Sequence, residues 1–297
     1  MNNFKKLISE FEESYKINLP LDDSMAYKMY PKHRQVYNKL LIAEFQSLDC
    51  GPYPIEPKKY PIVSKPVINL FGMGLNSKKI KNKDEFLNEH KTSNFWLEYL
   101  SGKHLSWDLI VRNGKILYHT CFFGKKKKFG SFIYWEQINE KILDNIKNII
   151  DNFLSDFTGC VNFETIGGKV IEVHLRMGDI DLTDIDIIKL AILNYIEPDN
   201  DIIKRQLKII NSKKINYVKL VPIWDRITEN LEERYNFVQD KIKPYLEEDD
   251  KVISYYEDMP NNASPDGLKR WFLILTYDLN HCLKLRTKLE NKIKLNS

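Results

Sequence analysis

A β-hairpin is predicted between residues 161 and 175, where hydrophobic and polar positions alternate. Val161–Ile166 and Lys169–Leu175 are rich in β-branched residues, and Gly167-Gly168 between them suits a tight turn. Alternate side chains of a strand share one face of the sheet. If a three-residue loop connects the strands, one face gathers five polar side chains, namely Asn162, Glu164, Glu172, His174 and Arg176.

The length of the turn decides whether the two glutamates stay together. A three-residue loop places Glu164 opposite Val170 and Glu172 opposite Asn162, with both carboxylates on the same face. A two-residue loop puts the glutamates on opposite faces, because a shift of one residue reverses every side chain of a strand. Only the first arrangement forms a cluster of carboxylates.

Further helices and strands are predicted on both sides of this hairpin. Apolar residues at helical spacing indicate helices over residues 3–16, 37–48, 84–91 and 138–153. Residues 60–66 and 94–100 are typical of buried strands, and Asn113-Gly114 is a strong hairpin signal. Gly124–Gly130 is interpreted as a basic loop bounded by glycines. After residue 179 the pattern favours helices over 182–196, 229–245 and 279–292, and strands over 218–224 and 267–275.

Composition is that of a globular soluble protein and limits the function mainly by exclusion. The 297 residues suffice for one large or two modest domains, and 43% are hydrophobic and 29% charged. A net charge of +4 over this length does not argue for nucleic acid. No apolar run approaches the length of a membrane span, and the first residues lack a signal-peptide core. The four cysteines have no metal-ligand spacing, so reduced thiols and a cytoplasmic location are expected. The sequence does not indicate an oligomeric state.

Two carboxylates on one strand face need a compensating charge, because like charges repel and raise each other's pKa. Mg²⁺ supplies such a charge, and it typically bridges one or two protein carboxylates to nucleotide phosphates. Arg176, on the same face, has a guanidinium group that can grip a phosphate or a carboxylate with two hydrogen bonds. The hairpin is therefore a candidate metal and phosphate site. The alternative is a solvent-facing strand whose charges pair only with one another.

The order of motifs over residues 31–180 resembles that of the ATP-grasp superfamily. Asn38-Lys39, followed by a helix and Cys50-Gly51-Pro52, is similar to the first nucleotide-binding lysine element, and Tyr60–Pro66 is similar to the strand that carries the second lysine. Gly72-Met73-Gly74 stands in the place of the glycine-rich phosphate loop. Residues 97–104 resemble the adenine-binding hinge, and residues 163–176 resemble the metal-ligand pair and the terminal Glu-x-Asn-x-Arg motif.

The resemblance implies an α+β fold in which two α/β lobes with antiparallel sheets enclose a nucleotide site. It implies an N-terminal helical extension over residues 1–30, a smaller lobe over 31–100 and a larger lobe with a C-terminal extension over 101–297. ATP would contact seven residues, namely Lys39, Lys65, Gly72, Gly74, Glu98, Leu100 and His104. Glu164 and Glu172 would hold Mg²⁺, and Arg176 and His174 would be catalytic.

Two positions depart from the family pattern. His174 stands where the family most often has Asn, and an imidazole is a poorer ligand for Mg²⁺ than an amide oxygen. His104 stands where many members have a ribose-binding Glu. His174 then either orients phosphate or substrate, or carries a proton. About 30 residues precede Pro31, fewer than the family's usual preceding domain needs, so substrate recognition is expected to come from elsewhere.

The chemistry implied by the resemblance is ligation through an acyl phosphate. A small-molecule or peptide carboxylate would attack the γ-phosphate of ATP, and an amine or similar nucleophile would then displace phosphate. A site with lysines, an arginine and carboxylates suits this chemistry, because phosphoryl transfer depends mainly on positioning and charge neutralisation. The alternatives are a regulatory or scaffolding module that binds nucleotide with weak or no catalysis, and a plain phosphotransferase.

Overall fold

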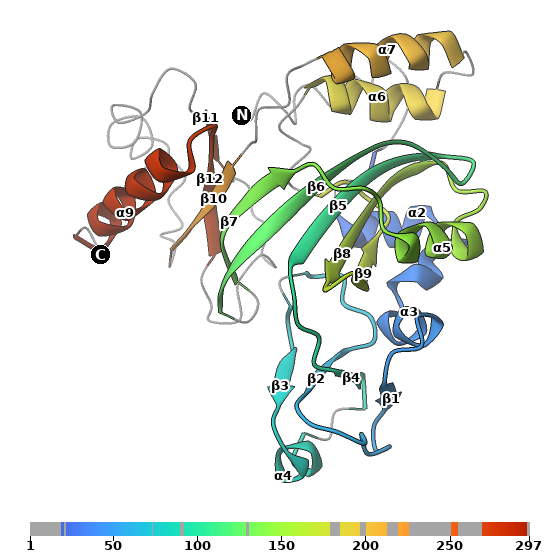
Figure 1. Ribbon diagram of the computed structural model, residues 1–297, viewed down its shortest axis with the longest axis vertical. Coiled ribbons are helices and arrows are strands. Elements are labelled where there is room, and N and C mark those ends of the chain that lie inside the picture. The colour runs from blue at the N-terminus through green and yellow to red at the C-terminus, as the bar shows by residue number, and fades with distance from the viewer. Residues whose placement is uncertain are drawn as a thin grey trace.

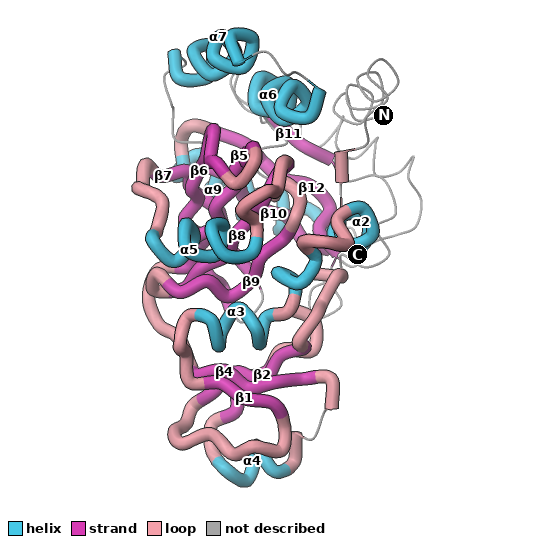
Figure 2. Tube along the Cα trace, turned by 90° about the vertical axis from the view of Figure 1, so that its right-hand side faces the viewer, coloured by secondary structure: helices cyan, strands magenta, loops and turns pink. Residues whose placement is uncertain are grey.

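The structure is a computed structural model that describes residues 19–20, 22–72, 74–89, 92–128, 131–178, 185–196, 200–212, 219–225, 251–254 and 269–295. The predicted helices over 3–16 and 229–245 lie outside these residues. Two antiparallel sheets organise the described chain, and the helix α3 lies between them in both views (Figures 1 and 2).

The smaller sheet has four strands in the order β1-β4-β2-β3. Its strands are β1 (Cys50–Pro52), β2 (Ile62–Pro66), β3 (Lys78–Ile80) and β4 (Asn94–Glu98). One face packs on α4 (Lys83–Leu87), where Phe86 is buried against Trp96 of β4. The opposite face carries Phe95, which packs with Ala43 of α3 (Lys39–Phe45). Lys65 pairs with Phe95 and shares its face, so the strand register aims this lysine toward the larger sheet.

The larger sheet has eight strands in the order β11-β12-β10-β7-β6-β5-β8-β9. Its strands are β5 (His104–Arg112), β6 (Lys115–Lys128), β7 (Ser131–Ile138), β8 (Gly159–Ile166), β9 (Lys169–His174), β10 (Lys219–Asp225), β11 (Lys251–Ser254) and β12 (Lys269–Thr276). The long strands β5 and β6 meet at Asn113-Gly114, where both residues have positive φ, as the hairpin signal predicted.

Helices cover both faces of the larger sheet. On one face, Leu109 and Val161 pack with three isoleucines of α5 (Asp144–Phe153). On the other face, Ile110 and Cys160 pack with α6 (Ile185–Ile196) and α7 (Asn200–Ser212). The remaining helices are α2 (Asp23–Met29), the 3₁₀ helix η1 (Arg34–Tyr37) and α9 (Leu279–Leu295). The helices α6 and α7 cover one end of this second face. The other end of the same face carries polar side chains, among them Asn162 and Glu164.

The β8–β9 hairpin keeps its polar side chains on one face, but its geometry differs from both turn lengths considered above. Its connection is a two-residue turn, because Ile166 pairs with Lys169 across Gly167 and Gly168, both of which have positive φ. The register then shifts between Glu164 and Thr165, and the extra residue is Ile171. This β-bulge offsets the short turn, so that Glu164 faces Glu172 directly and Asn162 faces His174. The pairing expected for a three-residue loop is therefore wrong, although the common face is right.

Two other predictions are corrected by strand pairing. The basic segment within 124–130 is not wholly a loop, because Lys125 pairs with Tyr134 and Lys126 with Phe132 as β6 runs on against β7. The helix expected over 138–153 begins only at Asp144, since β7 extends to Ile138. Within the described residues, no helix has both the length and the apolar character needed to cross a membrane.

Candidate functional site

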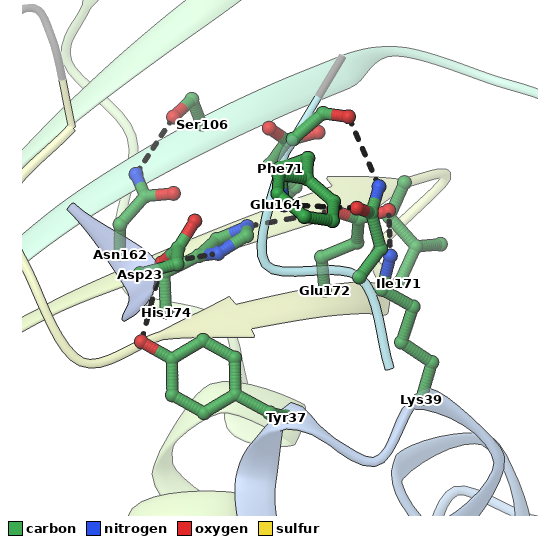
Figure 3. Close-up of polar contacts among 12 residues, drawn as sticks. Asp23, Tyr37, Lys39, Phe71, Ser106, Asn162, Glu164, Ile171, Glu172 and His174 are labelled. Atoms are coloured by element: carbon green, nitrogen blue, oxygen red, sulfur yellow. Dashed lines mark hydrogen bonds and ion pairs between the residues drawn. The ribbon is translucent and has the colours of Figure 1, made fainter. Parts of the chain in front are cut away.

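The polar face of β8 and β9 meets lysines from the smaller-sheet side of the molecule (Figure 3). Lys39, the first residue of α3, lies with its Nζ 2.8 Å from Glu172 Oε1. Lys65 donates from its Nζ to the carbonyl oxygen of Ile171 at 3.0 Å. The structure thus brings both predicted lysines to the predicted carboxylate strand. The bulge matters for this contact, because Ile171 is the residue that it adds to β9.

Glu172 lies between two cationic side chains. Lys39 contacts its Oε1, and the Nε2 of His174 lies 3.4 Å from its Oε2. Burial opposes ionisation of this carboxyl, but the charge of Lys39 and the contact with His174 outweigh it and hold the pKa of Glu172 well below its usual value. Glu172 is therefore a carboxylate at neutral pH.

Glu164 is held from β5. The Nε2 of His104 lies 2.9 Å from Glu164 Oε2, and the imidazole ring also packs edge-on against the rings of Phe132 and Trp135. Burial opposes ionisation of Glu164, but the hydrogen bond and charge of His104 lower its pKa. Both facing glutamates are thus kept ionised in spite of their proximity, and His104 belongs to the site.

Lys65 is nearly inaccessible to solvent, with 5% of its surface exposed. Burial lowers its pKa to about 8, although the charge of Glu172 works in the other direction. The side chain therefore still carries its charge at neutral pH. A buried ammonium near two carboxylates is suited to neutralise an anionic ligand, because the low-dielectric surroundings strengthen charge interactions.

His174 and Arg176 meet a residue that the sequence interpretation did not include. Asp23, at the start of α2, accepts from His174 Nδ1 at 3.0 Å on one carboxylate oxygen and from Arg176 Nη2 at 2.9 Å on the other. Tyr37 donates to Asp23 at 3.2 Å and accepts from the backbone N–H of Leu175 at 3.0 Å. Burial opposes ionisation of Asp23, but its two cationic partners hold its pKa below the usual range.

The protonation of His174 follows from these contacts. Burial lowers the pKa of an imidazole, but the charge of Asp23 and its hydrogen bond overcome that effect and raise the pKa of His174 to about 9. Both ring nitrogens of the protonated ring are donors, one toward Asp23 and one toward Glu172. A doubly protonated imidazole has no lone pair to offer a metal ion, so this geometry favours the orienting role over a metal contact.

Three predicted residues, Asn162, Glu98 and Leu100, have contacts outside this cluster. Asn162 lies on the expected face, but its amide donates within the larger sheet, to Ser106 and Asp108, both at 2.9 Å. Glu98 ends β4 and accepts from the backbone N–H of Asp49, while Leu100 packs against the hydrophobic cluster that contains Phe95.

The two glycines of the expected phosphate loop both have positive φ. A side chain at Gly72 would meet no atom within 4 Å, yet its φ of +70° is one that other residues rarely adopt. The loop is tied back locally, because Asn69 donates from its amide to the Gly72 carbonyl and accepts from the Phe71 N–H. This placement leaves the phosphate role of Gly72 and Gly74 a prediction.

The donor set fits Mg²⁺, the ion that the resemblance implies. Glu164 and Glu172 face one another on neighbouring strands, and both carry lowered pKa values, as carboxylate ligands require. Among the residues that the structure describes, no group of three or more His, Cys, Asp or Glu side chains is arranged to hold a metal ion alone. Two carboxylates with the other ligands from water and phosphate are the usual coordination of Mg²⁺ at nucleotide sites.

The pKa shifts predict a fall in stability as the pH rises from about 6.5 to 8. The pKa of His174 is raised from 6.5 to about 9, so its contribution is complete below pH 6.5 and is lost as the pH approaches 9. Lys65, whose pKa is lowered to about 8, has the opposite dependence. Its destabilising contribution is constant below that pH and is relieved as the pH rises above it. Thermal unfolding measured across this range should show a falling melting temperature, and His174→Gln should flatten the profile. Parallel profiles for the two proteins would mean that the imidazole is not held protonated.

No protein-family model and no curated protein sequence matches the chain. Solved structures do match it in fold. The crystal structure of an L-amino acid ligase from Bacillus licheniformis has a TM-score of 0.55 and 14% identity, with 94% of this chain and 75% of that chain covered. An N5-carboxyaminoimidazole synthetase from Staphylococcus aureus has a TM-score of 0.56 and 12% identity, with 90% and 77% covered, and its complex with ADP matches with a TM-score of 0.54, 11% identity, and 86% and 72% covered.

These solved structures are ATP-grasp ligases, and the likeness shows that the present chain has the ATP-grasp fold. The predicted α+β fold with two antiparallel sheets is thereby confirmed. At identities this low the likeness concerns the fold, and the chemistry depends on the residues between the sheets.

Proposed function

We propose that the protein is an ATP- and Mg²⁺-dependent ligase that activates a carboxylate as an acyl phosphate and transfers the acyl group to an amine or a similar nucleophile. The observation that carries the proposal is the meeting of two ionised glutamates on β8 and β9 with Lys39 and Lys65 from the smaller-sheet side. Such a set of charges suits a nucleotide triphosphate with its metal ion. The structural neighbours, an L-amino acid ligase and an N5-carboxyaminoimidazole synthetase, are consistent with this chemistry.

In this proposal the residues divide into three groups. The smaller lobe, over residues 31–100, contributes Lys39, Lys65 and the backbone N–H groups around Gly72 and Gly74 to the phosphates. The backbone near Glu98 and Leu100 reads the adenine base, and His104 lies near the ribose while it holds Glu164. Residues 101–297 form the larger lobe with a C-terminal extension, and residues 1–30 form an N-terminal extension.

The reaction needs little acid-base chemistry from the protein in its first step. An oxygen of the substrate carboxylate attacks the γ-phosphorus, and the bond from that phosphorus to the bridging oxygen breaks as ADP leaves. Lys39 and Lys65 neutralise the charge on the phosphate oxygens. Glu164 and Glu172 would hold Mg²⁺, which would supply further neutralisation of the charge on those oxygens. The acceptor nitrogen then attacks the acyl carbon, the carbon–oxygen bond to phosphate breaks, and the nitrogen loses a proton to water. Arg176 stabilises the acyl phosphate.

ATP should stabilise the protein against heat, and more so with Mg²⁺. A ligand at 100 times its Kd stabilises a folded protein by about 2.7 kcal/mol, which for a protein of this size corresponds to a rise in melting temperature of about 5 °C. We expect such a rise at millimolar ATP with Mg²⁺, and a smaller one with EDTA. The absence of any shift would contradict the proposal at its first step.

Release of ADP and phosphate, with mass spectrometry of the products, separates a ligase from the alternatives. With pooled amino acids and other carboxylates and amines, a ligase forms an amide and releases both products. A phosphotransferase forms ADP and a stable phosphorylated product. A nucleotide-binding module shows the thermal shift but no turnover.

A further inference from the structure

Asp23 occupies an unusual place for a carboxylate. Its side chain is 3% exposed, and it comes from α2, 151 residues before His174 and 153 before Arg176. Figure 3 shows it beside His174, with Tyr37 approaching from the side of η1. Asp23 lies before the motifs over residues 31–180 and is not part of them. The hydrogen bonds nevertheless join it to two of the residues that carry the proposed chemistry.

Packing alone does not explain a charge at this position. A buried carboxylate is costly unless it is paired, and an apolar side chain of similar volume is often as stable or more stable. Asp23 is paired with the cations His174 and Arg176 and with the hydroxyl of Tyr37, so its charge is matched to these partners. Each partner is thereby held in one orientation.

The contacts form a chain that ends at the proposed metal ligand. Asp23 binds the Nδ1 side of His174, which turns the Nε2 side toward Glu172. Glu172 in turn meets Lys39 on its other oxygen. Through its second oxygen Asp23 also holds Arg176, which lies two residues beyond the end of β9. One carboxylate therefore fixes both the imidazole behind Glu172 and the guanidinium group.

We propose that Asp23 is a positioning residue of the ligase: through His174 it orients Glu172 for Mg²⁺, and directly it orients Arg176 for the acyl phosphate. The inference rests on the proposed function for its activity readout. It extends the site to α2, a helix that precedes the lysine elements along the chain. Asp23 touches neither substrate nor metal in this role, so its removal disturbs the later steps more than the capture of ATP.

The neighbouring residue offers a matched control. Asp22 is exposed and caps α2 by accepting from the backbone N–H of Met25 at 2.7 Å. Asn is as good an N-cap as Asp, so Asp22→Asn removes a negative charge one residue away and keeps the helix start intact. Asp23→Asn removes the same charge. It also replaces one carboxylate oxygen with an amide donor, so either His174 or Arg176 loses its hydrogen-bond acceptor. A comparison of these two variants isolates the buried contacts.

For Asp23→Asn we expect kcat to fall by about 10- to 100-fold, the usual cost of losing a partner that orients a metal ligand. The Kd for ATP without Mg²⁺ should stay within about threefold of wild type. With ATP present, the Mg²⁺ concentration that gives half of the additional, Mg²⁺-dependent rise in melting temperature should increase by about tenfold. Asp22→Asn should match wild type in all three measurements. Addition of His174→Asn to Asp23→Asn should cost less than the product of the single effects, because the two residues act through one contact.

A purely structural role gives a different result. Asp23→Asn would then lower the melting temperature, while the folded protein kept its kcat and its Mg²⁺ dependence, and the proposal would be overturned. If Asp23→Asn does not fold, Tyr37→Phe decides, since it removes one donor to Asp23 and the acceptor of Leu175 N–H. The proposal then requires kcat to fall at least about threefold with unchanged ATP affinity, and an unchanged kcat overturns it. If wild type binds ATP and Mg²⁺ but ligates nothing, the proposed function fails, and the Mg²⁺ dependence of the variants still tests Asp23.

Discussion

Glu172→Gln should lower turnover by at least about 100-fold, the scale seen when one charge-stabilising group is removed from a preorganised site. Gln has the same shape as Glu, but it lacks the negative charge that faces Lys39 and the proton of His174. Mg²⁺ would then be held by Glu164 alone among the two carboxylates. Steady-state rates of ADP release with saturating ATP measure the effect.

Binding of ATP separates this loss from a collapse of the site. Without Mg²⁺ the variant should bind ATP as well as wild type or better, because the site has one negative charge fewer to repel the triphosphate. Glu140→Gln is the matched control, since Glu140 pairs with Lys103 at 3.4 Å on the exposed surface. It should leave rate and affinity unchanged. A Glu172→Gln variant with wild-type turnover would remove Glu172 from the metal site.

Lys65→Met should weaken ATP binding by roughly 10- to 100-fold, both with and without Mg²⁺. A hydrogen bond to a charged group contributes about 1.5–3 kcal/mol, and each 1.4 kcal/mol is a factor of ten in affinity. Met keeps most of the volume of the buried stem, so packing against Phe95 is retained while the charge is lost. If the ammonium contacts ATP equally in the ground and transition states, as the proposed function requires, the loss should appear mainly in Kd and KM rather than in kcat. Isothermal titration and KM values measure it.

An exposed lysine beside the same four-stranded sheet provides the comparison. Lys83 forms an ion pair with Glu56 at 2.8 Å, and 59% of its side chain is exposed. Lys83→Met should therefore bind ATP as wild type does. Equal ATP affinities for Lys65→Met and wild type would place the nucleotide somewhere other than between the two sheets.

The local parts of the site could be predicted from the sequence. Alternation of β-branched and polar residues predicts β8 and β9, and the Gly-Gly dipeptide predicts their tight turn. The run from Ile62 to Pro66 likewise forms the strand that delivers Lys65. These features depend on a few neighbouring residues and on a period of two, so nearby amino acids are sufficient to specify them. The order of such motifs was also enough to predict the ATP-grasp fold.

The bulge at Ile171 could not be predicted in this way. The pattern offered a choice between two turn lengths, and a bulge combines the short turn with the register of a longer connection. Its energy depends on what the irregular backbone contacts. Here the Ile171 carbonyl accepts from Lys65. The neighbouring Val170 donates its backbone N–H to the side-chain oxygen of Gln46, and its carbonyl accepts from the side-chain nitrogen of Gln46. Those partners are more than 100 residues away along the chain.

The sequence by itself thus determined which strands and turns form and which charges they carry, since those properties are local. Only the tertiary structure decided that Asp23 and Tyr37 join the site. The Asp-Asp-Ser sequence of residues 22–24, at the start of α2, signals a helix start, but both aspartates fit that pattern and only Asp23 is buried. A charge is stable in the interior only beside its partners, and those partners come within reach when η1 and α2 pack on the larger sheet, because burial and pairing are properties of the whole fold.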